Sequence, residues 1–452
     1  MALGNAKELT EGRAMPLLLG FTVPILLGAV LQQFYLLTDS AIVSNFIGMS
    51  SLAAGGASSS ITFLILGFCN GCSGGMAIPV AQAFGARDYV SLRKYVFNSL
   101  RVTALLSVAL AVAAVLMCPL IIRWIKLPAE ISTQACTYLA IILGGIPCTF
   151  YYNLLSSIIR ALGDSKTPFL FLLFSSLLNI ALDLLFITVF CWGVAGAAVA
   201  TVLSQGVSAV FCFRFMKEHY DLLWDNPEDR TWDWRTVKAL MAVGAPMGFQ
   251  FSITAIGSIM LQSANNALGT VYVAAFAAGI RIKMLFMVAL ESLGVAMTTF
   301  CGQNYGAGKN ERIIEGVKAS LVMITVYSVL AFAVMWPLAK PLSMIFASAG
   351  DVEIIAATMK YIRVSVSAFF LLGTLCLFRY SIQGLGYTNF AMWSGVMEMI
   401  ARIFVAFVMV SPLGFTAVCF GDAIAWVLAN LFLVPAFIFV FRKVSGRAQS
   451  KI

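Results

Sequence analysis

Charged residues are scarce in this chain, at 11% of 452 residues, whereas hydrophobic residues make up 61%. A soluble domain has about 25% charged and about 45–50% apolar residues. Here the apolar residues form runs of about 18 or more, separated by short polar stretches, as in α-helices that cross a membrane. The alternation of apolar and polar residues that a membrane β-barrel needs is missing. The sequence therefore predicts an all-α polytopic membrane protein.

Residues that carry metal or covalent chemistry are also few. The single histidine, His219, lies in a charged stretch, and the ten cysteines are scattered, mostly within apolar runs. Cys69 and Cys72 match a CxxC spacing, but no neighbouring Cys or His completes a metal site. No HExxH or GxSxG motif is present. We therefore expect neither an enzyme nor a protein with a bound metal or cofactor.

Positive charge exceeds negative charge by 9, but its distribution does not indicate a nucleic-acid partner. The basic residues lie between the apolar runs, as the positive-inside rule describes. We assign 21 Lys and Arg residues, Arg379 among them, to one side of the membrane and three to the other. Both termini are therefore predicted to be cytoplasmic, in a multi-pass protein of the cell membrane. The five basic residues within spans are Arg281, Lys283, Lys360, Arg363 and Arg402.

Twelve membrane spans can be placed on the apolar runs, and the longest polar stretch, 217–238, separates six of them from the other six. We predict an N-lobe at 1–216, a partly helical cytoplasmic linker at 217–236, and a C-lobe at 237–452. The predicted spans are 16–46, 52–82, 95–122, 131–159, 168–190, 194–216, 237–266, 271–301, 313–337, 353–382, 388–411 and 414–441.

The two halves repeat at a nearly constant spacing. Gln82-Ala83-Phe84-Gly85-Ala86 recurs as Gln303-Asn304-Tyr305-Gly306-Ala307, and Gly193 recurs as Gly414, both 221 residues later. A constant offset over most of a half indicates duplication. Each half has an even number of spans, so both enter the membrane from the same side. We therefore expect two six-helix lobes related by a pseudo-two-fold axis along the membrane normal, with a central cleft between them.

Acidic residues inside apolar spans are costly, and they usually mark an ion or proton site. Asn179 and Asp183 are four residues apart in one span, so they project from one helix face. Asp39 lies in the first span and Thr201 in the sixth. Two carboxylates, an amide oxygen and a hydroxyl suit Na⁺ or a shared proton. The alternative is a neutral hydrogen-bonded set that only ties helices together.

Three further acids lie within spans of the second half. Glu398 and Arg402 are four residues apart in the favoured order, which favours a structural ion pair over the alternative of a place in the substrate cavity. Glu291 has no basic residue at pairing distance on its own helix, and its role stays open between structure and a substrate cavity. Asp422 lies close to a span end, where it could reach water.

Several motifs, spread over about residues 15–442, together carry a family resemblance. They are Pro24, Gln33 and Asp39; residues 82–86; residues 160–168; Asn179 and Asp183; Gly193, Gly196, Ala197 and Ala198; and residues 302–308. The chain resembles the multidrug and toxic compound extrusion (MATE) transporters. The resemblance implies a twelve-helix, two-lobed exporter that couples inward H⁺ or Na⁺ movement to efflux of organic, mostly cationic compounds. It also implies that Asp39, Asn179, Asp183 and Thr201 form the cation site, as in the DinF-like branch.

One departure from another branch of that family limits the expected sites. NorM-like members carry acids in the seventh and tenth spans, whereas here 246–266 and 361–380 contain none. A second cation site in the C-lobe is therefore not expected. Gln33, Tyr35 and Asn153 are further candidates for a substrate cavity or a structural role.

The remaining expectations concern partners. Small organic substrates and membrane lipids are the expected partners of a functional monomer. A lipid-linked precursor flippase of the wider superfamily is the alternative function, although few Lys and Arg residues lie within the spans to hold a pyrophosphate.

Overall fold

The computed structural model describes the chain except for residues 1–7, 48, 126–128, 348–349 and 450–452. Helices make up nearly all of the described part, and no strand occurs in it. The helices of the first half are α1 (Ala14–Phe46), α2 (Met49–Gly85), α3 (Tyr89–Ile125), α4 (Ala129–Gly144), α5 (Ile146–Ala161), α6 (Lys166–Leu184) and α7 (Gly193–His219). Those of the second half are α8 (Trp234–Asn266), α9 (Thr270–Gly306), α10 (Asn310–Ser343), α11 (Val352–Ser367), α12 (Phe369–Gly384), α13 (Thr388–Phe404), α14 (Val410–Leu413) and α15 (Phe415–Gln449).

The number of membrane spans agrees with the sequence. Within the described residues, ten helices are long and apolar enough to cross a membrane. Two bent pairs, α4 with α5 and α11 with α12, bring the number to twelve when each pair counts as one span. The bends are 43° and 48°. Pro147 at the start of α5 accounts for the first bend, because proline cannot donate a backbone hydrogen bond to the preceding turn. The predicted all-α class and twelve spans are confirmed.

Helix lengths repeat between the halves as the sequence motifs do. Helices α1 and α8 have 33 residues each, α2 and α9 have 37, and α4, α5, α11 and α12 have 16. A five-residue π-helix occurs at matching places, η1 (Leu185–Val189) after α6 and η4 (Val405–Met409) after α13. Glycines with positive φ also recur, such as Gly193 at +58° and Gly414 at +54°. The duplication therefore extends from sequence to local backbone geometry.

The described chain divides into two compact units. Of the described residues, the first unit comprises 8–9 and 23–248, and the second comprises 10–22 and 249–449. The unit boundary falls inside α1, beside Pro24, and inside α8, beside Pro246. The predicted lobe limits at 216 and 237, and the symmetry axis between the lobes, stay predictions.

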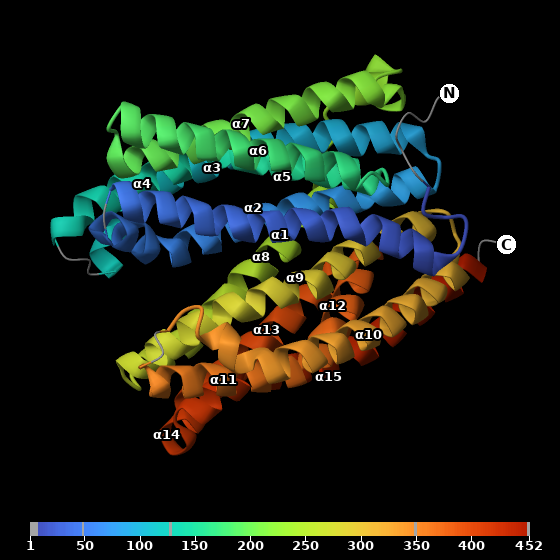
Figure 1. Cartoon of the computed structure of the whole chain (residues 1–452). Helices are drawn as coiled ribbons and strands as arrows, with labels where there is room; N and C mark the ends of the chain where they lie inside the picture. The colour runs from blue at the N-terminus through green and yellow to red at the C-terminus, as the bar shows by residue number, and fades with distance from the viewer. Residues whose placement is uncertain (1–7, 48, 126–128, 348–349, 450–452) are drawn as a thin grey trace. The chain divides into compact units, whose positions relative to one another are not determined.

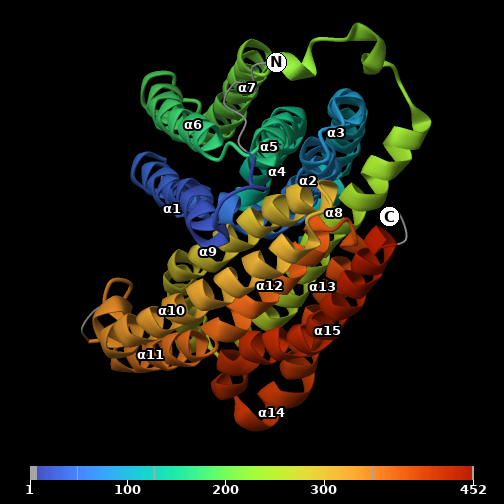
Figure 2. The same ribbon diagram turned by 90° about the vertical axis from the view of Figure 1, so that its right-hand side faces the viewer.

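Each unit is built around one short central helix. In the first unit α5 packs against α2, α3 and α7, and Phe150, Leu154 and Ile158 are fully buried. In the second unit α12 packs against α9, α10 and α15 in the same way. Helices α6 and α7 lie side by side, as Figures 1 and 2 both show. This pair holds Asn179, Asp183 and Thr201, three of the polar residues that the sequence singles out in the first half.

The linker contains two short 3₁₀-helices, η2 (Asp221–Leu223) and η3 (Pro227–Arg230), so its expected partial helicity is confirmed. Both contact α3. The buried Arg93 of α3 pairs with Asp229 at 2.7 Å and donates to the carbonyl oxygen of Leu222 at 3.1 Å. The linker is therefore attached to the first unit by a buried ion pair.

The N-terminal segment makes a long-range connection within the second unit. Lys309 Nζ donates to the carbonyl oxygen of Thr10 at 3.1 Å, and Arg312 Nη1 donates to that of Gly12 at 2.9 Å. These residues precede and begin α10. Residues 10–22 thus belong structurally with a part of the chain about 300 positions later.

Candidate functional site

Two carboxyl groups meet in the first unit. Asp39 of α1 and Asp183 of α6 lie against each other, close enough to share a proton. Asp183 is fully buried, and one oxygen of each carboxyl group has no hydrogen-bond partner in the described chain. No Lys or Arg of the described residues forms an ion pair with either group. We call Asp39 and Asp183 the acid pair.

Asn179 and Thr201 complete this polar site. The Asn179 amide is best satisfied when its nitrogen donates to Asp183 Oδ2 at 2.6 Å and its oxygen accepts from the Thr201 backbone N–H at 3.0 Å. The Thr201 hydroxyl lies 3.3 Å from the Asn179 side chain and donates to the carbonyl oxygen of Ala197 at 3.0 Å. The structure therefore brings together the four residues that the sequence groups.

Two tyrosines border the acid pair. The hydroxyl of Tyr35 on α1 lies 3.5 Å from Thr201 Oγ1. Tyr138 on α4 interacts electrostatically with both Asp39 and Asp183. The sequence analysis missed Tyr138, because a lone tyrosine in an apolar span is a common feature of membrane helices. Gln33 and Asn153 are half-buried on α1 and α5, and no hydrogen bond within the described chain joins either one to the acid pair.

Local sequence explains how α6 presents Asn179 and Asp183. Asp164 accepts hydrogen bonds from the backbone N–H groups of Lys166 and Thr167, both at 3.0 Å, and so caps the start of α6. The helix changes to the π-helix η1 two residues after Asp183. Such π-helical segments are frequent at functional sites, because the extra residue shifts the side chains that follow around the helix.

The donor set of the site suits a hard monovalent cation or a proton. It offers carboxylate, amide and hydroxyl oxygens but neither nitrogen nor sulfur ligands. Among the described residues, no group of three or more His, Cys, Asp or Glu side chains could hold a metal ion. The set therefore fits Na⁺ or H⁺ better than a transition metal.

The second unit buries a different arrangement of charge. Lys283 on α9 contacts Asp422 on α15, and Asp422 accepts from Arg402 Nε at 3.0 Å. Arg402 Nη2 donates to Glu398 at 3.2 Å, and Glu398 also contacts Arg379 on α12. We call Lys283, Asp422, Arg402, Glu398 and Arg379 the charge row. Cations and acids alternate along it, with a cation at each end.

Neighbouring hydroxyl groups hold the two ends of the charge row. Tyr361 on α11 accepts a hydrogen bond from Lys283 Nζ at 2.7 Å, and Ser394 on α13 accepts one from Arg379 Nε at 3.0 Å. Gly279 provides the space for the Tyr361 ring, since a Cβ at Gly279 would lie 2.4 Å from it. Small residues on α9 therefore let α11 approach closely enough to make this contact.

The charge row confirms one expectation and corrects another. The ion pair predicted between Glu398 and Arg402 forms. Asp422 does not reach out to water, because Lys283 and Arg402 both hold it. Arg379, which the sequence analysis counts on the cytoplasmic side, is buried within α12 and pairs with Glu398, and its side of the membrane stays a prediction. Sequence spacing could not reveal these contacts, because the partners lie 139, 20 and 19 residues apart.

Glu291 lies beside the charge row. It is on α9 with Lys283, and its side chain is exposed. It interacts electrostatically with Arg379, Glu398 and Lys283, but it forms no ion pair in the described part of the chain. The sequence left the role of Glu291 open, and the structure places it next to cations from two helices.

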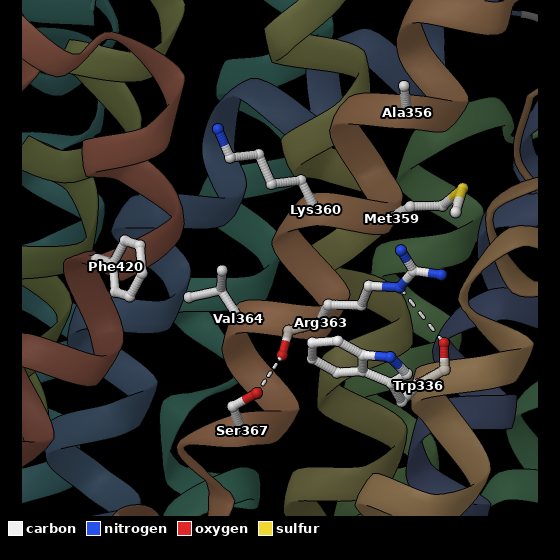
Figure 3. Close-up of a pocket in the computed structure, with 8 residues that line it drawn as sticks. All are labelled: Trp336, Ala356, Met359, Lys360, Arg363, Val364, Ser367 and Phe420. Carbon is white, nitrogen blue, oxygen red and sulfur yellow. Dashed lines mark hydrogen bonds between the residues drawn. The ribbon is translucent and has the colours of Figure 1, made fainter.

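A separate pocket of about 640 Å³ opens on the second unit between α10, α11 and α15 (Figure 3). Arg363 lies over the Trp336 ring at 5.4 Å, and Lys360 donates to Thr416 Oγ1 at 2.5 Å. Apolar side chains such as Val364 and Phe420 form another part of the wall. The pocket thus combines two cations with an apolar lining.

Comparisons with known proteins agree with the fold and the repeat. The MatE family model matches residues 24–185 and again residues 246–408. The probable multidrug resistance protein YpnP of Bacillus subtilis is 33% identical over 309 residues, which are 68% of this chain and 69% of that protein. The probable multidrug resistance protein NorM of Thermotoga maritima is 26% identical over 408 residues, which are 87% and 85% of the two chains.

A solved structure has the same fold. The crystal structure of a MATE protein in complex with MaL6 superposes with a TM-score of 0.87 at 24% identity, covering 97% of this chain and 98% of that one. The family model covers both halves, and YpnP is more than 30% identical over two thirds of each chain. The chain therefore belongs to the multidrug and toxic compound extrusion family, MatE, and is a multi-pass membrane transporter.

Proposed function

We propose that the protein exports small organic compounds and that inward movement of H⁺ or Na⁺ through the acid pair drives this export. The observation that carries the proposal is the contact between Asp39 and Asp183, which no Lys or Arg of the described chain neutralises. The relatives named as multidrug resistance proteins in Bacillus subtilis and Thermotoga maritima support the class of cargo.

The acid pair would act through charge repulsion. Two carboxylates in contact repel each other strongly where little water can screen them. A bound proton or Na⁺ would remove this repulsion and let α1 and α6 pack more closely at Asp39 and Asp183. Such a change shifts the protein between arrangements only if the cation binds them with different affinity. The coupling must be reciprocal, so a cation that weakens cargo binding is itself bound more weakly when cargo is present.

We propose a single cation site in each chain, nearer to the DinF-like pattern than to the NorM-like one. The seventh and tenth spans, α8 from Pro246 and α11 with α12 from Tyr361, contain no acidic residue. The buried acids of the second unit, Glu398 and Asp422, each contact two cations already. A further cation would therefore find no free carboxylate among these two residues.

Efflux from vesicles with separately imposed gradients tests the proposed function. Export of the fluorescent cation rhodamine 123 should respond to a pH gradient or to a Na⁺ gradient. The variant Asp183→Asn should reduce the driven rate to background, because it fixes the site in a neutral form. Asp225→Asn, a matched change in the exposed linker, should export like the wild type. Wild-type rates for Asp183→Asn, or no response of the wild type to either gradient, would contradict the proposal.

We propose that both termini are cytoplasmic and that the transporter acts as a monomer in the cell membrane. The charge asymmetry still supports this orientation after Arg379 is removed from the count. A cysteine introduced at Asp225 should react with a membrane-impermeant maleimide only in inside-out vesicles. The native Cys191, which is exposed between η1 and α7, should react only in intact cells. The reverse labelling pattern would show the opposite orientation.

Membrane lipids are proposed partners at the pocket of Figure 3. Lys360 and Arg363 suit an anionic phospholipid headgroup, while Trp336 and Phe420 suit the start of its acyl chains. Phosphatidylglycerol should raise the thermal stability of the purified protein more than phosphatidylcholine does. The double change of Lys360 and Arg363 to Gln should remove this difference.

The lipid-linked precursor flippase remains the second candidate function, because the charge row gathers three cations, Lys283, Arg379 and Arg402. Two acids within the row offset two of them. The single remaining positive charge is little for a pyrophosphate, which carries at least two negative charges. The drug exporter is therefore the preferred proposal.

A further inference from the structure

The ion pairs of the charge row do not balance all of its positive charge or use all of its hydrogen-bond donors. It contains three cations and two acids, and both acids already contact two cations each. The side chain of Arg402 is only 6% exposed, and its Nη1 atom is buried without a hydrogen-bond partner in the described chain. A buried guanidinium hydrogen that stays unpaired is costly, because it has lost its water and gained no acceptor. The row thus carries one positive charge and one unused donor group.

Glu291 does not complete the row. It interacts electrostatically with Arg379 and Lys283, the two ends, but it forms no ion pair in the described structure and its side chain is exposed. Eight residues separate Glu291 from Lys283, which is about 12 Å along α9. A carboxylate so weakly held could be replaced by another acidic group that approaches from the same exposed side.

Guanidinium groups recognise acidic groups in particular. Arginine presents a planar fork of N–H donors that matches the oxygens of a carboxylate or a phosphate. Two of the three cations of the row are arginines, and both are fixed by Glu398 before any ligand binds. A site in which the donors are already positioned loses less conformational entropy on binding.

We propose that the charge row binds an acidic group, a carboxylate or phosphate, of the transported compound and that Glu291 competes with this group. The proposal rests on the proposed function as an exporter of small molecules. It extends the expected cargo from organic cations to organic acids and zwitterions. A cation would be repelled by the net charge of the row, whereas a compound with one acidic group would neutralise it.

Equilibrium binding to the purified protein in nanodiscs tests this proposal without any ion gradient. Fluorescein, an organic acid, and rhodamine 123, a cationic ester of the same ring system, serve as matched probes. Glu291→Gln should tighten fluorescein binding about threefold, as expected for removal of one partly exposed charge that competes with the probe. The affinity for rhodamine 123 should not increase.

A matched control separates a local effect from a change of net charge. Glu353→Gln removes the same charge from an exposed position on α11, and it should leave fluorescein binding unchanged. A reciprocal variant, Lys283→Gln, should weaken fluorescein binding and serves as a second test if Glu291→Gln folds poorly. Equal effects of Glu291→Gln and Glu353→Gln, or unchanged fluorescein binding in Lys283→Gln, would overturn the proposal.

Two further outcomes identify the acid and separate this inference from the proposed function. Displacement of fluorescein by inorganic phosphate would support the site for free phosphate as well, and no displacement would support it for organic acids alone. Driven efflux of rhodamine 123 without any fluorescein binding would leave the exporter proposal intact and overturn the charge-row site. Fluorescein binding that responds to Glu291→Gln, without any driven efflux, would support the charge-row site and overturn the exporter proposal.

Discussion

The two halves of the chain repeat the same helices but bury charges of opposite net sign. In the first unit, Asp39 and Asp183 place two acids together without a basic partner among the described residues. In the second unit, the charge row alternates cations and acids and ends with a positive excess. Both sites lie directly before a π-helix, since Asp183 precedes η1 and Arg402 precedes η4. Both halves therefore have a π-helix at matching places, whereas the charged residues that precede it differ.

This difference indicates how tasks can be divided between repeated halves. An uncompensated acid pair responds strongly to a single bound cation, because the cation removes a repulsion. The charge row has a positive excess and both of its acids are already paired, so it offers a cation no free carboxylate and is held by its own contacts. The first half is thus suited to sense ions, and the second is suited to stability and to contact with an acidic group.

The largest expected effect concerns stability, and it contrasts the two sites. Glu398→Gln should destabilise the protein by about 3–5 kcal/mol, because Arg379 and Arg402 both lose a buried acidic partner. Asp183→Asn should not lower stability, since it relieves repulsion in the acid pair. Thermal unfolding of both variants in the same detergent checks this contrast. Equal unfolding temperatures would show that the charge row is no more structural than the acid pair.

A steric test compares the central helices α12 and α5. A Cβ added at Gly384, the last residue of α12, would lie 2.5 Å from the carbonyl oxygen of Thr298 on α9. The last residue of α5 is Ala161, so the first half already accommodates a methyl group there. Gly384→Ala should therefore cost about 1–3 kcal/mol of stability. Ala161→Gly should cost less, about 1 kcal/mol, through helix propensity alone. A Gly384→Ala variant as stable as the wild type would show that α9 and α12 can separate without loss.

Ion coupling should be lost when the acid pair of the first unit is changed. Asp39→Asn should reduce gradient-driven efflux at least about tenfold, or about 1.4 kcal/mol in barrier. Cargo binding to Asp39→Asn should no longer depend on pH or Na⁺ concentration, because the linked cation site is gone. Titrations of rhodamine 123 at several pH values and Na⁺ concentrations measure this. Persistent ion dependence would place the coupling site elsewhere.

The smallest expected effect concerns two matching turns. Arg87 has a φ of +56°, whereas the residue 221 positions later is Gly308 with a φ of +72°. Because this region is strained for side chains, Arg87→Gly should stabilise the turn by about 1 kcal/mol. The exposed pair of Arg87 with Glu8 at 3.0 Å offsets part of that gain. Chemical denaturation of Arg87→Gly beside Gly308→Ala should give shifts of opposite sign.

The long apolar runs were sufficient to predict the spans. A single segment that crosses lipid must pair its own backbone groups as a helix, and such a helix needs a long apolar run. The acidic residues Asp39 and Asp183 could be singled out for the same reason, since charge in a span is expensive. The partners of Lys283 and Arg379 on other helices could not be predicted. Spacing along one helix reveals a pair such as Glu398 and Arg402, but Lys283 meets Asp422 across 139 residues.

Tyr138 and Arg379 show two further limits of sequence reasoning. Tyr138 joins the acid pair through the packing of α4, and nothing in its own neighbourhood of the chain marks it. Arg379 lies five residues from the end of α12 and within the predicted span 353–382, but nothing in the sequence around it indicated a buried acidic partner. Only the structure shows that its side chain is buried against Glu398.

The hydrogen bonds from Lys309 and Arg312 to the backbone of Thr10 and Gly12 have a consequence for biosynthesis. The partners are 299 and 300 residues apart, so at about 5–20 residues per second the ribosome needs about 15–60 s to make the second after the first. During that interval the start of the first helix is in the membrane without its final contacts. An N-terminal half expressed alone would never obtain them. Residues 10–15, which precede the predicted span 16–46, should therefore be open to proteases in such a fragment and protected when the C-terminal half is expressed beside it.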